Sequence, residues 1–255
     1  MSLSVVPNPR VAFKVIYEDD ELIVVDKPAR LATQPGKGHD TDTLLNGLFE
    51  RFGHTLQNLG AARDYGLLHR LDRSTSGLLV VALRGKAYDG LRTAFETREV
   101  GKFYWAICGK GPRPPRKLTG VINKPILETE PRAGTPEKRV ARIHTGGKPS
   151  ATAYRVLSES AKGALIEARP VTGRLHQVRV HLDAIGCTVL GDDLYGPRSY
   201  RLAATRLALH AHRLTFTHPT TGAAMDVRSP FPKELRAVLT RLGLERPDEA
   251  EADAG

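Results

Sequence analysis

The sequence predicts an α+β fold. Short apolar runs bounded by turn residues recur along the chain and indicate strands, whereas only a few segments show helical spacing. Strands and helices do not alternate regularly, so the parallel sheet of a βαβ fold is not expected. With 40% hydrophobic residues over 255 positions, the chain can bury a full core without a disulfide or a metal. We expect one domain over residues 15–244, preceded by an extension, 1–14, and followed by an acidic tail, 245–255.

The first half of the chain is expected to contain three strands and two helices. Residues 15–17 and 22–25 are apolar runs around an acidic turn, and Pro28 ends the second run because the residue before a proline is held extended. Thr43 can cap a short helix. The residues of that helix expected to face inward are Leu44, Leu45, Leu48, Phe49 and Phe52. The apolar run 78–83 indicates a buried strand. Apolar residues then recur at helical spacing at Ala87, Leu91, Ala94 and Phe95.

The second half begins with an alternating segment, 102–108, that indicates a strand. Residues 110–150 are rich in proline and basic side chains and are expected to form loops, which in compact domains are either functional or disordered. Strands at 151–157 and 163–169, a helix at 173–185, strands at 206–216 and 224–228, and a helix at 233–242 are expected to follow. The tail is acidic and rich in alanine, and we expect it to be disordered.

The charge of the chain is strongly positive. The formal net charge is +10, and the acidic residues of the tail offset part of the positive charge of residues 1–244. Residues 245–255 hold five acidic residues and one basic residue, which leaves 37 basic and 23 acidic residues in 1–244, a net charge of +14. This excess indicates either a polyanionic partner or a soluble basic surface. Nucleic acid is the favoured partner, because arginines crowd the motifs described below.

The sequence also bears on location. Cys108 and Cys187 lie in apolar surroundings, which is typical of reduced core thiols in a cytosolic protein. The N-terminus shows no signal-peptide pattern, and no apolar stretch approaches the roughly 20 residues of a membrane helix. We expect a soluble, cytoplasmic monomer with no membrane partner.

The most informative segment has the sequence HRLDRSTSG, from His69 to Gly77, directly before an expected strand. Asp72 lies between Arg70 and Arg73, and nearby cations keep a carboxylate ionised even when it is partly desolvated. Such a carboxylate suits nucleophilic or base chemistry. An aspartate in a surface salt bridge is the other interpretation, and position alone leaves both open.

This segment resembles the HRLDxxTSG motif of the RluA-type RNA pseudouridine synthases, whose aspartate is the catalytic residue. Further segments match in order: Lys102-Phe103-Tyr104 the family's K-x-Y, residues 172–181 its TGRxHQ(I/L/V)RxH, and residues 189–196 its GDxxYG. Residues 27–31 resemble its KPxGL, with Arg30 in place of the glycine. If that position needs a positive φ, arginine is strained there. The resemblance runs from about Val15 to about Pro230.

The resemblance implies the pseudouridine synthase fold, a long mixed, mainly antiparallel sheet with helices and loops on its faces. It also implies the isomerisation of uridine in structured ribosomal or transfer RNA. The N1–C1′ bond breaks, the uracil turns within the site, and C5 bonds to C1′. No group is transferred and no redox change occurs, so no cofactor and no metal is expected. A stacked uridine must first be extruded from its helix or loop.

Two points stay open at this stage. Asp72 would either attack C1′ or remove the 2′ hydrogen, and the sequence does not choose between the routes. The family's common N-terminal S4 RNA-binding module needs more residues than precede Val15, so we expect it to be absent.

The predicted helix 173–185 carries two expected faces. Its buried stripe is formed by Leu175, Val178, Leu182 and Ile185. Its substrate face, suited to phosphate or base contacts, is formed by Arg174, Gln177 and His181. Arg179 adjoins the apolar stripe and must be paired or reach water. Asp183, four residues on, is an ordinary partner for it, whereas the resemblance implies that Arg179 binds Asp72 through two parallel hydrogen bonds.

The remaining site residues also take their roles from the resemblance. A lone strand tyrosine is by default a core residue, but Tyr104 is implied to stack on the target uracil and to assist proton removal from C5. Its ordinary pKa near 10 makes it a weak base. Val178 is expected to pack against the target nucleotide. Arg70 is expected to displace the target base or to bind phosphate, with His69 beside it among the substrate-binding residues.

Other classes of function are less well supported. A metal hydrolase would draw on the nine histidines, but His176 and His181 are five residues apart, whereas helical ligand pairs are usually four apart. His210 and His212 could share a strand face, but no third candidate ligand lies at a spacing typical of metal sites. A glycosidase would need a second catalytic carboxylate. A non-catalytic RNA-binding module explains the charge but not the catalytic motif residues, and it is the alternative from another class.

Overall fold

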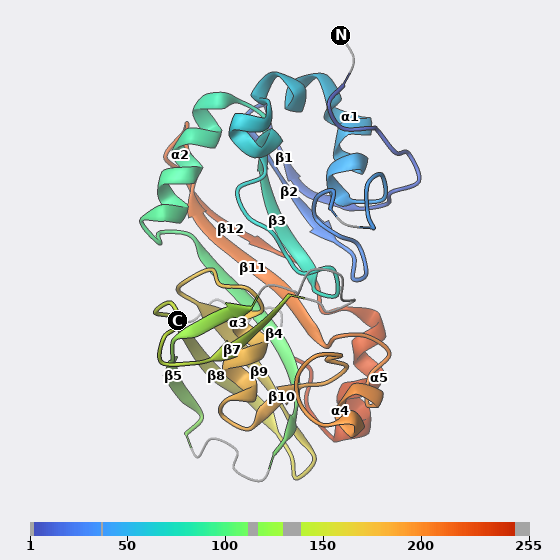
Figure 1. Ribbon diagram of the computed structural model, residues 1–255, viewed down its shortest axis with the longest axis vertical. Helices are drawn as coiled ribbons and strands as arrows, with labels where there is room; N and C mark the ends of the chain where they lie inside the picture. Colours follow the sequence, from blue (N-terminus) through green and yellow to red (C-terminus); the bar gives the residue numbers. More distant parts are fainter. Residues whose placement is uncertain (1–2, 37, 112–116, 130–138, 248–255) are drawn as a thin grey trace. The chain divides into compact units, whose positions relative to one another are not determined.

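The computed structural model describes residues 3–36, 38–111, 117–129 and 139–247 (Figure 1). The chain divides into two compact units. The first comprises Met1–Gly101 and Ala211–Ser229, and the second comprises Lys102–His210 and Pro230–Gly255.

The first unit contains five strands, as the apolar runs predict. They are β1 (Lys14–Glu18), β2 (Leu22–Lys27), β3 (Ser76–Ala82), most of β11 (Leu209–Thr217) and β12 (Ala224–Arg228). They lie in the order β1-β2-β3-β11, with β12 paired to β11. The β1–β2, β2–β3 and β11–β12 pairs are antiparallel. In the β2–β3 pair, Lys27 lies opposite Gly77, so the end of β2 adjoins the HRLDRSTSG segment.

The helices of this unit are α1 (Leu44–Leu59), the short 3-10 helix η1 (Ala61–Gly66) and α2 (Gly85–Glu96). Thr43 is the N-cap of α1, and its backbone N–H donates to the Asn46 side chain at 3.1 Å. The helix is longer than predicted, because it continues through a kink at Phe52, where φ is −124°. Phe52 is therefore only half-buried, and the prediction that it faces inward with its four neighbours is wrong.

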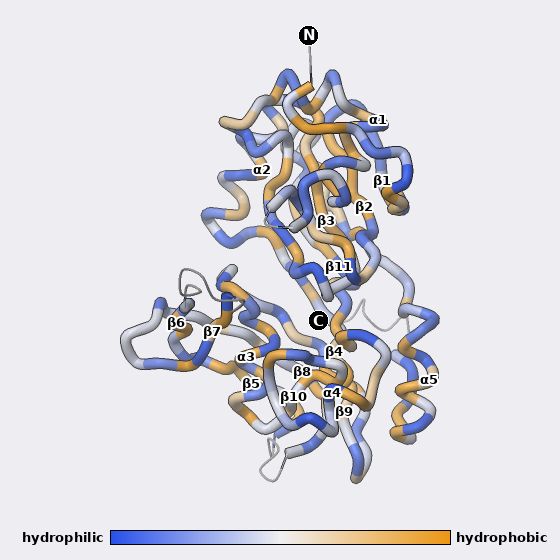
Figure 2. The backbone as a smooth tube through the Cα atoms, turned by 45° about the vertical axis from the view of Figure 1, so that its right-hand side comes forward, coloured by the Kyte–Doolittle hydropathy of each residue, from blue (hydrophilic) through white to orange (hydrophobic). Residues whose placement is uncertain are grey.

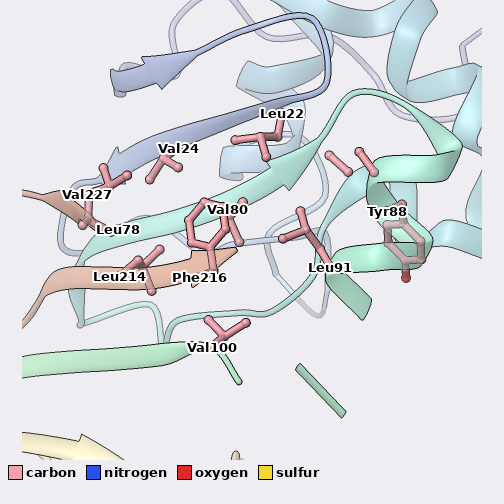
Figure 3. Packing of buried hydrophobic residues seen from close by; sticks show 12 residues of the cluster. Leu22, Val24, Leu78, Val80, Tyr88, Leu91, Val100, Leu214, Phe216 and Val227 are labelled. Atoms are coloured by element: carbon pink, nitrogen blue, oxygen red, sulfur yellow. The ribbon is translucent and has the colours of Figure 1, made fainter. Parts of the chain in front are cut away.

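The core of the first unit is formed by strand residues and α2. Figure 3 shows side chains of β2, β3, β11 and β12 packed together with Tyr88 and Leu91 of α2. All seven residues of β3 are buried, and Figure 2 colours β2 and β3 orange over most of their length. Because both faces of this strand are buried, residues 78–83 are apolar at every position rather than at alternate positions.

The second unit contains β4 (Gly101–Lys110), β5 (Thr119–Asn123), β8 (Ala151–Glu159), β9 (Gly163–Pro170) and β10 (Cys187–Val189). Their order is β4-β9-β8-β5, with β10 paired to β4, and these pairs are antiparallel. A separate hairpin joins β6 (Ile126–Thr129) to β7 (Val140–Ile143). Residues 110–150, which the sequence predicts to be rich in loops, also contain β5, β6 and β7. Four basic residues of this segment, Arg113, Arg116, Arg132 and Lys138, lie outside the described residues.

The helices of the second unit are α3 (Gln177–Asp183), α4 (Arg198–Leu202) and α5 (Lys233–Leu242). The bounds of α5 are those predicted. Helix α3 is shorter than the predicted 173–185, since residues 173–176 form a turn and His176 has a φ of 51°. Val180 of α3 packs against Ile126 and Ala141 of the β6–β7 hairpin. The helix is thereby fixed to the hairpin through its apolar side.

The strand pairs given above are antiparallel, so the predicted α+β class with a long, mainly antiparallel sheet is confirmed. Cys108 and Cys187 are both buried and unbridged. Among the described residues, no helix is long and apolar enough to cross a membrane. Residues 248–255 of the tail that we expect to be disordered lie outside the described part of the chain.

Candidate active site

Asp72 stands in the segment that leads into β3. Its side chain is half-buried, whereas Arg70 and Arg73 on either side are exposed. Within the described residues, no ion pair joins Asp72 to either arginine. Arg73 instead helps to lower the pKa of the exposed Asp42, after the larger effect of the hydrogen bond from His39. The catalytic interpretation of Asp72 stays a prediction.

The backbone beside Asp72 is clamped by one buried hydroxyl. Thr33 Oγ1 donates to the carbonyl of Leu71 at 2.9 Å and accepts the N–H of Leu71 at 3.2 Å. Thr33 and Leu71 are each 5% exposed. The carbonyl of Thr33 in turn accepts the N–H of Leu45 at the start of α1. The position of Asp72 is thus tied to the first turn of a helix almost 30 residues earlier in the chain.

The strand end opposite this segment is held by a buried lysine. Lys27 is fully buried, and its ammonium donates to the carbonyls of Pro28 at 2.9 Å and Leu31 at 2.7 Å. The loop between these two carbonyls contains Arg30 with a φ of 69°. This is the left-handed conformation that glycine adopts without strain and arginine does not. The substitution of the family's glycine by arginine therefore falls on a position where glycine has a physical advantage.

His69 and Gly77, at the two ends of the motif, have structural contacts. His69 Nε2 accepts the N–H of Val80 at 3.2 Å, and its ring lies 5.0 Å from that of Phe95. Gly77 has a φ of 119°, and a Cβ atom there would overlap the backbone of Ala211. Only glycine allows β3 and β11 to approach so closely. These contacts explain the motif's first and last residues without reference to substrate.

Tyr104 lies on β4, in the second unit, and is 9% exposed. Lys102 stands two residues earlier, hence on the same face of the strand, and burial lowers the pKa of its ammonium. On the other face, Trp105 stacks on His210 with a centroid distance of 6.1 Å. The strand therefore presents a tyrosine and a partly desolvated cation side by side.

The predicted substrate face of helix 173–185 is not formed. Arg174 lies in the turn before α3, and its Nε is buried without a hydrogen-bond partner among the described residues. Gln177 is 4% exposed and bonds to Thr152 and the carbonyl of Ala151. His181 is fully buried between Thr152 Oγ1 and the carbonyl of Lys124, both at 2.9 Å, and burial lowers its pKa. The geometric prediction was wrong because Gln177 and His181 fasten α3 to β8.

Arg179 is buried within the second unit, with its side chain 3% exposed. Its Nε and Nη2 each donate to one oxygen of Asp192 at 2.7 Å, and the Asp192 side chain is 1% exposed. Asp183, the partner expected from helical spacing, accepts a hydrogen bond from Thr188 at 2.6 Å and forms no ion pair with Arg179. The preceding residue, Val178, is 6% exposed.

Asp192 is the residue of this site that sequence reasoning missed. The signal was present, because Asp192 stands in the GDDLYG segment that matches the family pattern. Gly191 before it has a φ of 74°, and a Cβ atom there would overlap the carbonyl of Arg206. In the part of the chain that the structure describes, no group of three or more His, Cys, Asp or Glu side chains is arranged to hold a metal ion.

A sequence model of the family described as RNA pseudouridylate synthase matches residues 21–184. The chain belongs to this family. Pseudouridine synthases are isomerases that convert uridine to pseudouridine in RNA, and RNA is their substrate. Asp72, Tyr104 and Arg179 lie inside the matched segment, whereas Asp192 lies beyond it.

Curated relatives extend the match over most of this synthase. The ribosomal large subunit pseudouridine synthase D of Zymomonas mobilis is 35% identical, over 93% of this chain and 77% of the relative. The ribosomal large subunit pseudouridine synthase C of Vibrio vulnificus is 34% identical, over 91% of this chain and 70% of the relative.

Solved structures agree with the fold of this synthase. The human RNA pseudouridylate synthase domain containing 4 superposes with a TM-score of 0.68 at 27% identity, covering 92% of this chain and 94% of the other. The human RNA pseudouridylate synthase domain containing 1 also gives 0.68, at 30% identity and with coverage of 91% and 89%.

Proposed function

We propose that this synthase isomerises uridines in ribosomal RNA of the large subunit, with Asp72 as the catalytic group. The two curated relatives described above, which match over most of the chain, are named for the large ribosomal subunit, which supports ribosomal over transfer RNA. The observation that carries the catalytic assignment is the half-buried Asp72, held beside a backbone that Thr33 clamps on both sides. A fixed backbone limits the positions that the Asp72 carboxylate can reach, which favours attack on a single atom.

Asp72 serves either route of the reaction through its ionised form. In one route a carboxylate oxygen bonds to C1′ as the N1–C1′ bond breaks, and the uracil leaves as an anion. In the other the carboxylate removes the 2′ hydrogen and the same bond breaks, leaving a glycal. In both, the detached uracil turns and C5 bonds to C1′. In the first route the bond between the Asp72 oxygen and C1′ breaks at this step, and in the second the carboxylate returns the proton to C2′. The hydrogen on C5 is then removed as a proton with the help of Tyr104, and N1 takes up a proton. The atoms of the nucleotide are conserved and no cofactor enters.

Tyr104 and Arg179 support this chemistry in the proposal. Tyr104 stacks on the uracil while it is detached and takes part in removal of the C5 proton; the neighbouring Lys102 lies on the same strand face. Arg179 binds Asp72 and aims its carboxylate. Arg70 is exposed and suits a phosphate or the displaced base. Val178 packs beside the nucleotide.

The experiment is a map of pseudouridines in total RNA from a strain that lacks the protein. A plasmid carrying the wild type should restore one or more pseudouridines in large-subunit ribosomal RNA, and Asp72→Asn should restore none while still binding RNA. Asp42→Asn, which changes an exposed carboxylate of the same unit, serves as the matched control. Restored positions in transfer RNA alone would overturn the ribosomal substrate. Activity of purified Asp72→Asn within about tenfold of wild type would overturn the catalytic role.

A further inference from the structure

Arg179 is held on one edge by a carboxylate that is itself immobile. Asp192 accepts two hydrogen bonds of 2.7 Å, from Nε and Nη2 of the guanidinium. Its Oδ1 also accepts the backbone N–H groups of Leu194 at 2.9 Å and Tyr195 at 3.1 Å. The turn that follows Asp192 thus closes around the carboxylate and fixes its plane.

Arg179 is also held on one face. The Tyr195 ring lies 5.1 Å from the guanidinium carbon, a distance at which cation and ring attract each other. The Tyr195 hydroxyl accepts the N–H of Ala141 at 3.0 Å and lies 2.9 Å from Nδ1 of His176. The ring is therefore anchored to β7 and to the turn before α3, and both contacts oppose its movement away from the arginine.

This geometry determines how the arginine can meet a second carboxylate. A planar guanidinium offers two edges for paired hydrogen bonds, Nε with Nη2 and Nη1 with Nη2. Asp192 takes the first edge, so that a second carboxylate can be bound in the same paired manner only through the other. Because an arginine side chain has several rotatable bonds, its guanidinium could otherwise adopt many orientations. The pair with Asp192 restricts it to one, in which Nη2 also lies 3.6 Å from Oδ1 of the exposed Asp193.

We propose that Asp192 is a positioning residue of the isomerase reaction, which fixes the orientation of the Arg179 guanidinium within the second unit. This inference rests on the proposed function, in which Arg179 aims Asp72. Asp192 touches neither substrate nor reacting atoms and acts only through Arg179. Its loss should therefore slow the chemical step and leave RNA affinity unchanged, a separation that a merely structural role would not produce.

The first test compares Asp192→Asn with Asp183→Asn. Asp192→Asn keeps an oxygen for the backbone N–H groups but loses the charge and one acceptor for the guanidinium. Asp183→Asn alters another carboxylate of the same unit, four residues from Arg179 and not paired with it. In single turnovers at saturating enzyme, Asp192→Asn should lower the rate at least about thirtyfold with the RNA Kd within about twofold, and Asp183→Asn should stay within about threefold of wild type.

The second test asks whether Asp192 acts through Arg179. If it does, Asp192→Asn should lower the rate by less than about threefold in an Arg179→Lys background, because the aim is already lost. Asp192→Glu keeps the charge but moves the carboxylate by one methylene. Should Asp192→Asn fail to fold, Asp192→Glu decides: a loss of about tenfold or more at unchanged melting temperature and RNA Kd supports the proposal, and a wild-type rate overturns it.

These experiments distinguish a failure of the proposed function from a failure of the positioning role of Asp192. If wild type forms no pseudouridine, or Asp72→Asn stays active, the proposed function fails. Suppose instead that wild type is active and Asp72→Asn is not. Then only the inference about Asp192 fails if Asp192→Asn keeps the wild-type rate. It also fails if Asp192→Asn lowers the rate by the same factor in the Arg179→Lys background as in wild type.

Discussion

The hydroxyl of Thr33 is predicted to hold the catalytic loop, and Thr33→Val tests this with a near-isosteric change. The substitution removes the hydroxyl that bonds to both the N–H and the carbonyl of Leu71, at 3.2 and 2.9 Å, while keeping the shape of the side chain. A buried backbone group left without its partner costs about 1–3 kcal/mol. Because the adjacent Asp72 is half-buried, water reaches part of this loop. We therefore expect the lower part of the summed range, about 2–4 kcal/mol.

Urea denaturation followed by the fluorescence of the single Trp105 measures the loss of stability. Release of tritium from RNA labelled at uridine C5 measures the chemical step, at a temperature well below the melting transition. Thr33→Val should lower the single-turnover rate at least about tenfold, because the backbone that carries Asp72 is no longer fixed. Thr33→Ser keeps the hydroxyl and loses one methyl, so it should cost about 1 kcal/mol and retain most of the rate.

The reasoning would be refuted if Thr33→Val unfolded within about 0.5 kcal/mol of wild type, since that would mean the hydroxyl contributes no net bond to Leu71. Equal loss of rate in Thr33→Ser and Thr33→Val would also contradict it, because the methyl rather than the hydroxyl would then be the group that matters.

Two further predictions concern the arginines and the absence of a metal. Arg179→Ala should lower the single-turnover rate, and Arg179→Lys should not restore it fully, because lysine cannot make a paired contact. Arg174→Ala should instead weaken RNA binding and reduce its salt dependence by about one counterion. A larger loss of the chemical step in Arg174→Ala than in Arg179→Ala would contradict this assignment. EDTA added after the RNA has folded should leave activity intact; a loss that zinc reverses and magnesium does not would contradict the prediction that no metal takes part.

Short-range patterns predicted most of the elements. The strand after the motif and the helix Lys233–Leu242 follow from runs and periodicities that a few consecutive residues define. The start of α3 does not follow from them. Gln177 accepts the N–H of Arg174 and the hydroxyl of Thr172 through its side chain, and Leu175 N–H donates to Glu128 of β6. These contacts hold the preceding turn out of the helix, and a helical wheel contains no information about them.

The sequence by itself determined the family, the fold class and the identity of the motif residues, because these depend on which residues are present and on their local spacing. Only the tertiary structure decided what each motif residue touches. Arg179 pairs with Asp192, thirteen residues away, rather than with Asp183 on its own helix. The backbone beside Asp72 is clamped by Thr33, 38 positions from its partner. Such pairs form because a buried charge or backbone group must find a partner of fitting geometry within the folded chain, wherever in the sequence that partner lies.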